Sequence, residues 1–177
     1  MTEHAAHFGR ADLRTDVAAF YDRSVPEVYR YFHRATAGDR RLTEDLTQET
    51  FTACVRAARD GVADAMTMPW LMGVARHKLI DHYRRRTREE RKLSLVWSAR
   101  TDDSATTTTF DVTDVEALTA LSLLSDQHRL VLVLRYVDDL SVNEVADATG
   151  RSVRATESLI VRARHALEHI VKEASDV

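Results

Sequence analysis

The sequence predicts an all-α protein of two small helical domains joined by a flexible linker. Apolar residues recur every three to four positions over most of the chain, and strand-like alternation is almost absent. Only two prolines and five glycines occur in 177 residues, of which 44% are hydrophobic and 30% charged. This composition is typical of a folded, helix-rich protein and excludes a disordered chain. The length fits one domain or two small ones, each with a marginal core.

The first domain, expected over 10–92, contains three helices. The first helix covers about 10–36 and ends before Gly38. Thr43 is the expected N-cap of the second helix, because its hydroxyl suits the free amides of a first turn. Pro69 marks the first turn of the third helix, where a missing amide hydrogen costs nothing.

The third helix ends in a basic run, "LIDHYRRRTREERK", in a chain whose net charge is -3. Such a run often marks only the solvent-exposed C-terminal end of a helix, where positive charge interacts favourably with the helix dipole. The same helix also carries Trp70, His77 and Tyr83. Aromatic surface beside arginines is what extruded bases and their phosphates require. The pattern therefore favours a nucleic-acid surface over the solvated end.

Residues 93–113 lose the helical period and are expected to form the linker. The second domain, over 114–173, contains four helical segments. In the third of these, Ser141 and Glu144 have the spacing of a capping box, and Gly150 closes the helix. The next helix starts at once, with Ser152 as its cap. Two helices joined by a tight glycine turn predict a helix-turn-helix.

In a helix-turn-helix, the second helix enters the major groove of DNA. An ordinary helical hairpin with a solvated polar face is the alternative. The coincidence of capping box, glycine turn and basic residues favours DNA binding. The residues that the second helix would offer to DNA are Arg151, Ser152, Arg154, Glu157, Ser158 and Arg162.

Other site classes have little support in the sequence. The single cysteine, Cys54, allows neither an internal disulfide nor a multi-thiolate zinc site, and is expected in the core. His165 and His169 lie one turn apart with Glu168 between them, but a third metal ligand in register is missing. The chain has no glycine-rich phosphate loop and no nucleophile elbow. We therefore expect no metal, no cofactor and no catalysis.

The sequence also indicates where the protein works. Its apolar runs fall short of the roughly 18 to 20 residues that a membrane span needs. The N-terminus, "MTEHAAHFGR", lacks the basic-then-apolar order of a signal peptide. We therefore expect a cytoplasmic protein with no membrane insertion of its own.

Three stretches together resemble one known family. They are "DLTQETF" (45–51), "WLMGVARHKLIDHYRRR" (70–86) and "LSLLSDQHRLVLVLRYVDDLSVNEVADATGRSVRATESLIVRARHAL" (121–167). Their order and spacing are similar to those of extracytoplasmic-function (ECF) sigma factors, the minimal two-domain class of bacterial transcription initiation factors. The resemblance implies a region 2 helical bundle and a region 4 helix-turn-helix.

The resemblance also implies partners and roles. The family binds the RNA polymerase core at the β' clamp helices and the β flap, reads the -10 and -35 promoter elements, and is usually held by an anti-sigma factor. On this basis the loop at 60–68 would take an extruded base, and Asp102, Asp103 and Asp111 of the linker would mimic nucleic acid. The candidates for core binding are Asp45, Gln48 and Glu49. The candidates for -10 DNA are Trp70, His77, Tyr83, Arg84, Arg85, Arg86 and Arg88.

Two departures from the family pattern concern promoter choice. His77 stands where asparagine is common, and Thr156 and Leu159 replace a frequent valine and arginine.

Two other functions compete with the interpretation as a sigma factor. A free-standing helix-turn-helix regulator would bind duplex DNA without polymerase, although it would have no use for the Trp70 helix. A hydrolase or metal site built on the histidines would require bound zinc.

Overall fold

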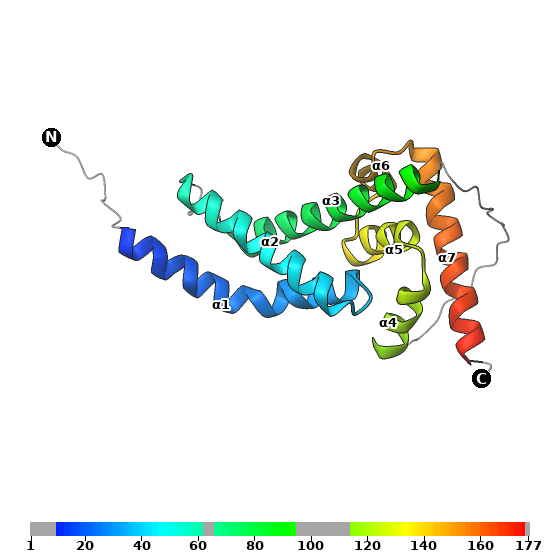
Figure 1. The fold of residues 1–177 in the computed structure, drawn as a ribbon, viewed down its shortest axis with the longest axis horizontal. Helices are drawn as coiled ribbons and strands as arrows, with labels where there is room; N and C mark the ends of the chain where they lie inside the picture. The colour runs from blue at the N-terminus through cyan, green and yellow to red at the C-terminus, as the bar shows by residue number, and fades with distance from the viewer. Residues whose placement is uncertain (1–9, 62–65, 95–113, 176–177) are drawn as a thin grey trace. The chain divides into compact units, whose positions relative to one another are not determined.

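The computed structural model describes residues 10–61, 66–94 and 114–175, and helices are their only regular secondary structure (Figure 1). The all-α prediction is therefore confirmed over this part of the chain. Residues 62–65 of the expected base-binding loop and 95–113 of the expected linker, with the three aspartates named there, lie outside it. The elements are α1 (Arg10–Ala35), α2 (Arg40–Arg59), α3 (Met68–Ser94), α4 (Asp114–Leu123), α5 (Asp126–Leu132), the π-helical segment η2 (Val133–Val137), α6 (Val142–Thr149) and α7 (Val153–Ser175).

The chain divides into two compact units. The first unit comprises Met1–Phe32 and Arg40–Lys78, and the second comprises His33–Asp39 and Leu79–Val177. The division falls inside α1 and inside α3, whereas the sequence suggested boundaries at 92 and 114. The last turns of α3 thus group with the C-terminal helices.

In the first unit, α2 turns three of its four threonines inward. Thr43, Thr47 and Thr50 are buried among apolar neighbours on the same helix. The hydroxyl of Thr47 donates to the Thr43 carbonyl at 2.7 Å, and that of Thr50 donates to the Leu46 carbonyl at 2.8 Å. Each buried hydroxyl of this pair is therefore satisfied within the helix itself. The N-cap prediction for Thr43 is wrong, because α2 begins earlier, at Arg40.

Phe51 and Cys54 complete this core, and the exposed Tyr21 packs on its edge. The rings of Tyr21 on α1 and Phe51 on α2 meet edge to face, with centroids 4.6 Å apart. Cys54 is buried, as expected. Burial raises the pKa of its thiol to about 11, so the thiol stays neutral at physiological pH.

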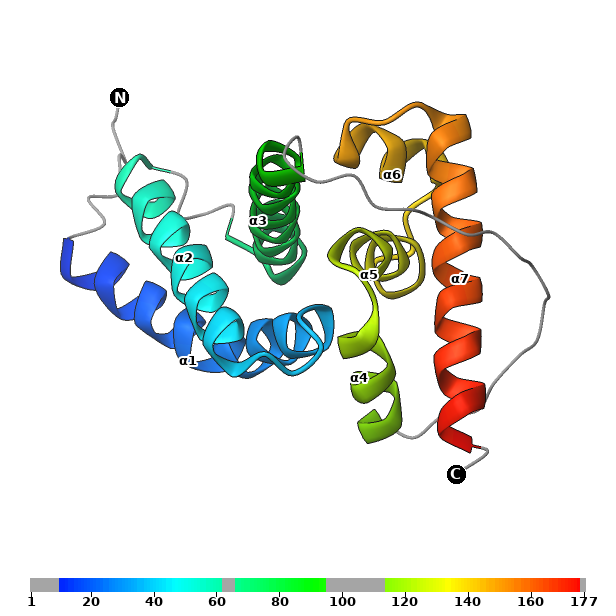
Figure 2. The same cartoon turned by 45° about the vertical axis from the view of Figure 1, so that its right-hand side comes forward.

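In the second unit, α7 packs along α4, α5 and α6 (Figure 2). The predicted capping box is confirmed at α6. The Ser141 amide donates to the Glu144 carboxylate at 2.8 Å, and the Glu144 amide donates to the Ser141 hydroxyl at 3.3 Å. Gly150 closes the helix with φ 68°, a left-handed conformation that glycine adopts without strain. The Ala155 amide then donates to the hydroxyl of Ser152 at 3.3 Å, which caps α7.

A buried arginine joins α4 to α5. The Arg129 side chain donates to the carbonyls of Leu121 at 2.8 Å, Ser122 at 3.3 Å and Leu124 at 3.0 Å. These carbonyls lie at or just beyond the end of α4, where helical carbonyls lack intrahelical partners, and that of Leu121 also accepts from the Leu124 amide at 3.3 Å. Asp126 lies 3.7 Å from the same guanidinium and partly balances its charge. The arginine is only 9% exposed, so it acts as a fixed C-terminal cap for α4.

We expect Arg129→Met to lower the free energy of unfolding by about 3 kcal/mol, because the carbonyls at the end of α4 lose a buried charged donor and Asp126 keeps only its ion pair with Arg86. Urea unfolding followed by circular dichroism measures this. Arg164→Met is the matched control on α7: its side chain is 38% exposed and pairs with Glu168 at 3.6 Å. That change should cost less than about 0.5 kcal/mol. Equal losses for the two variants would contradict the capping role.

Candidate nucleic-acid interface

The first half of α3 carries the expected base-contacting side chains. Trp70 is half-buried in the first turn, where its amide donates to the Thr67 hydroxyl at 3.4 Å. His77 lies seven residues later and is exposed. Residues seven apart lie close to one face of a helix. The indole and the imidazole therefore share a face of α3 that is accessible in the first unit.

The arginines of the last turns of α3 differ in their surroundings. Arg85 and Arg88 are exposed. The Arg86 guanidinium pairs with the Asp126 carboxylate through Nε and Oδ2, 2.6 Å apart, and Asp126 is only 11% exposed. Arg84 donates to the Asp147 carbonyl at 3.2 Å. Arg88 Nε donates to the Arg84 carbonyl at 3.1 Å. Three of the four arginines expected to bind phosphates thus already contact groups of the second unit in this structure.

Tyr83 does not belong to the accessible surface. Its side chain is 1% exposed, and its hydroxyl donates to the Ala35 carbonyl at 3.0 Å. Burial raises the pKa of the phenol, although the nearby Arg129 guanidinium opposes the shift. The expected DNA contact at Tyr83 is therefore replaced by a core role that joins the ends of α1 and α3.

The helix-turn-helix presents most of its expected residues outward. Arg154, Glu157 and Ser158 are exposed near the start of α7, with Ser152 at its cap. Arg162 is half-exposed and donates to the Ser158 carbonyl at 3.3 Å, so it lies along the same face.

Three residues of this motif lie elsewhere. Arg151 is half-buried and donates to the Gln127 side-chain oxygen at 2.7 Å. Thr156 and Leu159 are 0% and 4% exposed. These last two side chains pack in the core of the second unit.

A third surface lies on α2. Asp45, Gln48 and Glu49 are all exposed on one face of the helix and line a shallow cavity of 400 Å³. Arg56 continues this face, and Lys78 of α3 lies 3.7 Å from the Glu49 carboxylate. Sequence reasoning missed both basic residues. The spacing alone could have placed Arg56 on the same face of α2 as Asp45 and Gln48, because residues eight and eleven apart lie near one helical face.

Each histidine of α7, His165 and His169, lies beside a glutamate of the same helix. His165 Nδ1 lies 3.3 Å from a Glu168 carboxylate oxygen. No group of three potential metal ligands occurs among the described residues. In the same part of the chain, no helix is long and apolar enough to span a membrane.

Comparison with known proteins identifies both halves of the chain. Residues 20–89 match the model of Sigma-70 region 2, and 114–167 match that of Sigma-70 region 4. The chain is 31% identical to the ECF RNA polymerase sigma factor SigC of Mycobacterium tuberculosis (strain CDC 1551 / Oshkosh), over 84% of this chain and 80% of that protein. It is 29% identical to the ECF RNA polymerase sigma factor SigM of Bacillus subtilis (strain 168), over 84% and 90%. The chain belongs to the ECF RNA polymerase sigma factors.

The fold of this sigma factor also has a counterpart among solved structures. The sigma factor RpoE from Bartonella quintana, in its complex with the anti-sigma factor NepR, is similar with a TM-score of 0.51 and 20% identity, over 89% of this chain and 97% of that one. Both family models fall on segments that contain the surfaces described above. Trp70, His77 and the arginines lie in region 2, and the helix-turn-helix lies in region 4.

If Tyr83 serves the core, Tyr83→Phe should lower the free energy of unfolding by about 1 kcal/mol, since one buried hydrogen bond is lost. Its affinity for promoter DNA in the presence of core polymerase should remain that of the wild type. Urea unfolding and filter binding measure the two quantities. If the variant had normal stability but a weakened promoter complex, Tyr83 would instead be a DNA-contacting residue.

Proposed function

We propose that this sigma factor uses three separate surfaces in promoter-dependent transcription. The exposed face of α2 binds the β' clamp helices of core polymerase. The Trp70 face of α3 and its terminal arginines bind the -10 element, and the start of α7 reads the -35 element. The observation that supports this assignment is the joint exposure of an indole, an imidazole and arginines on α3, beside a capped helix-turn-helix on the same chain.

The residues divide between base and backbone contacts. The half-buried indole of Trp70 still has exposed surface on which a base can stack, and stacking contributes about 1 to 3 kcal/mol per base. His77 presents ring nitrogens to base edges. Arg85 and Arg88 are exposed and suit phosphates, which give affinity without sequence information. The assignment of Arg84 and Arg86 requires that their contacts to Asp147 and Asp126 open when DNA binds.

The α7 face combines both kinds of contact. Arg154 supplies planar guanidinium donors that match a guanine edge, whereas Glu157 accepts from cytosine. Ser152 and Ser158 suit phosphate oxygens, and Arg162 follows on the next turn. Because Thr156 and Leu159 are buried behind them, the outer residues of this helix alone set the -35 preference.

Control by an anti-sigma factor is part of the proposal. The structurally similar RpoE was crystallised with the anti-sigma factor NepR, and the α2 face together with the cavity beside it would suit such a partner. The cavity of 720 Å³ on the first unit combines apolar and aromatic side chains with polar and charged ones, a mixed surface that an amphipathic partner helix can cover. Its lining includes Tyr21, Tyr29, Phe51 and Val55 together with Glu44, Gln48, Arg56 and Arg59.

Run-off transcription with purified core polymerase tests the proposed function directly. We expect the chain to copurify with core and to give transcripts from promoters selected from a random library. DNA binding without core, and no promoter-dependent transcript with it, would instead support the free-standing regulator.

The salt dependence of the promoter complex tests the arginine assignment. Arg85→Ala should weaken the complex uniformly across promoters and lower the slope of log K against log salt by about 1, because fewer counterions are released. Arg30→Ala is the control, since Arg30 is also exposed but lies on α1 and donates to the Pro26 carbonyl at 3.1 Å. An unchanged slope for Arg85→Ala would show that this end of α3 is only solvated.

Charge reversal on α2 tests the polymerase-binding surface. Asp45→Lys should weaken binding to core by about tenfold. A partner surface that is complementary to the Asp45 carboxylate would meet a positive charge in the variant, and the two like charges would repel. Asp22→Lys makes the same change on the exposed part of α1 and should leave the affinity for core unchanged. Fluorescence anisotropy of the labelled chain with core polymerase gives both affinities. Equal effects would remove α2 from the core-binding surface.

A further inference from the structure

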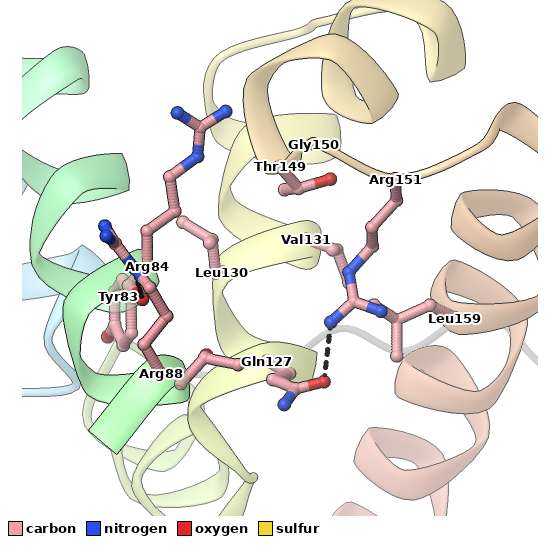
Figure 3. A pocket seen from close by; sticks show the side chains of 11 residues that line it. Tyr83, Arg84, Arg88, Gln127, Leu130, Val131, Thr149, Gly150, Arg151 and Leu159 are labelled. Carbon is pink, nitrogen blue, oxygen red and sulfur yellow. Dashed lines mark hydrogen bonds between the residues drawn. The ribbon is translucent and has the colours of Figure 1, made fainter. Parts of the chain in front are cut away.

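One cavity of the second unit brings together arginines from both proposed DNA-binding elements. It has a volume of 410 Å³, and Arg84, Arg88 and Arg151 line it. Figure 3 shows Arg84 and Arg88 on α3 at one side and Arg151 at the other, with Gln127, Leu130 and Val131 of α5 between them. Arginines that are distant in sequence thus line one cavity.

The electrostatics of this cavity favour an anion. None of the described residues that line it is acidic. The Arg84 guanidinium donates to the Asp147 carbonyl at 3.2 Å and lies 3.8 Å from the Cβ position of Gly150, so the C-terminal end of α6 holds it in place. Arg88 Nε donates to the Arg84 carbonyl at 3.1 Å. These bonds use one donor of each side chain and go to neutral oxygens, which leaves further N–H groups for a ligand.

The third arginine is oriented from the opposite wall. The Arg151 guanidinium donates to Gln127 Oε1 at 2.7 Å (Figure 3). Thr149 lies beside it and has its hydroxyl directed to the Val145 carbonyl at 2.7 Å. Leu130, Val131 and Leu159 add an apolar wall. The cavity therefore combines a charged rim with a nonpolar floor.

We propose that this cavity binds a diphosphate group, either free or as part of a nucleoside diphosphate. Arginine forks match phosphate oxygens in paired hydrogen bonds, and a diphosphate offers enough oxygens for three forks at once. The volume falls within the roughly 300–1,000 Å³ of small-ligand sites. The apolar wall of Leu130, Val131 and Leu159 suits the base of a nucleotide.

The ligand and promoter DNA compete for the same side chains. Arg84 and Arg88 serve -10 DNA in the proposed function, and this consequence rests on that function. Binding of the anion itself does not, because it follows from the cavity alone. A bound diphosphate holds the last turns of α3 against the helix-turn-helix, so it favours the form in which these arginines are withheld from DNA.

Isothermal titration of the full chain with inorganic pyrophosphate and, separately, with adenosine diphosphate tests the proposal. We expect saturable binding of one molecule per chain. Arg88→Gln and Arg151→Gln should each weaken it by about tenfold, since each removes charge-assisted bonds. The matched control is Arg154→Gln, which changes an exposed arginine of α7 outside the cavity and should leave the affinity unchanged. Thermal unfolding verifies that all three variants fold.

The two titrants distinguish the source of the diphosphate. Tighter binding of the nucleotide assigns the apolar wall to its base, and equal binding assigns the site to the free diphosphate. Absence of saturable binding for both titrants overturns the proposal. So does an equal loss in Arg154→Gln, because the anion would then respond only to overall charge.

Filter binding of promoter DNA with core polymerase, without added anion, separates this proposal from the proposed function. A normal promoter complex without pyrophosphate binding rejects the cavity alone. Pyrophosphate binding without a promoter complex rejects the proposed DNA surfaces alone.

Discussion

The guanidinium of Arg129 fixes the junction between α4 and α5, and the helices of the second unit depend on it. It satisfies three carbonyls at the end of α4 while its charge is balanced by Asp126. Asp126 in turn pairs with Arg86 on α3 at 2.6 Å. Because buried charges are stable only when paired and hydrogen-bonded, these three side chains constrain one another. The position of α5 sets that of α7, along which it packs, and thereby the position of the proposed -35 surface.

In α2, buried threonine hydroxyls donate to backbone carbonyls, which lets polar side chains pack in the core. A helix with so many polar residues on its exposed face needs an inner face that can still pack in a core. Thr47 and Thr50 satisfy their own hydroxyls with carbonyls one turn earlier, so they behave as small core residues. The outer face then remains available for Asp45, Gln48 and Glu49. The short segment "DLTQETF" can therefore be polar at nearly every position and yet have two distinct faces.

The sequence was sufficient to predict the helices, but not to predict the surroundings of every side chain. Capping at Ser141 and closure at Gly150 depend on local hydrogen bonds, so their spacing alone predicted them correctly. Thr43 was misjudged because an N-cap and a buried helical threonine look alike without knowledge of the partner face. Tyr83 was expected at a DNA surface, since no local pattern shows that its hydroxyl meets the Ala35 carbonyl 48 residues away. Arg129 was not noticed, because arginine is usually exposed and its acceptors come from another helix.

The acidic net charge of the chain and its local basic surfaces are compatible for a physical reason. Screening limits the reach of surface charge to about 8 Å at physiological ionic strength, so a phosphate responds to the arginines beside it and hardly to the chain total. What matters is whether an arginine already has an internal partner. Arg85 is exposed, whereas Arg86 pairs with Asp126, and Arg84 and Arg151 donate to neutral oxygens of the second unit. In the proposed function, promoter DNA displaces the internal partners of Arg84 and Arg86, so the energy of those contacts would set how readily this sigma factor engages DNA.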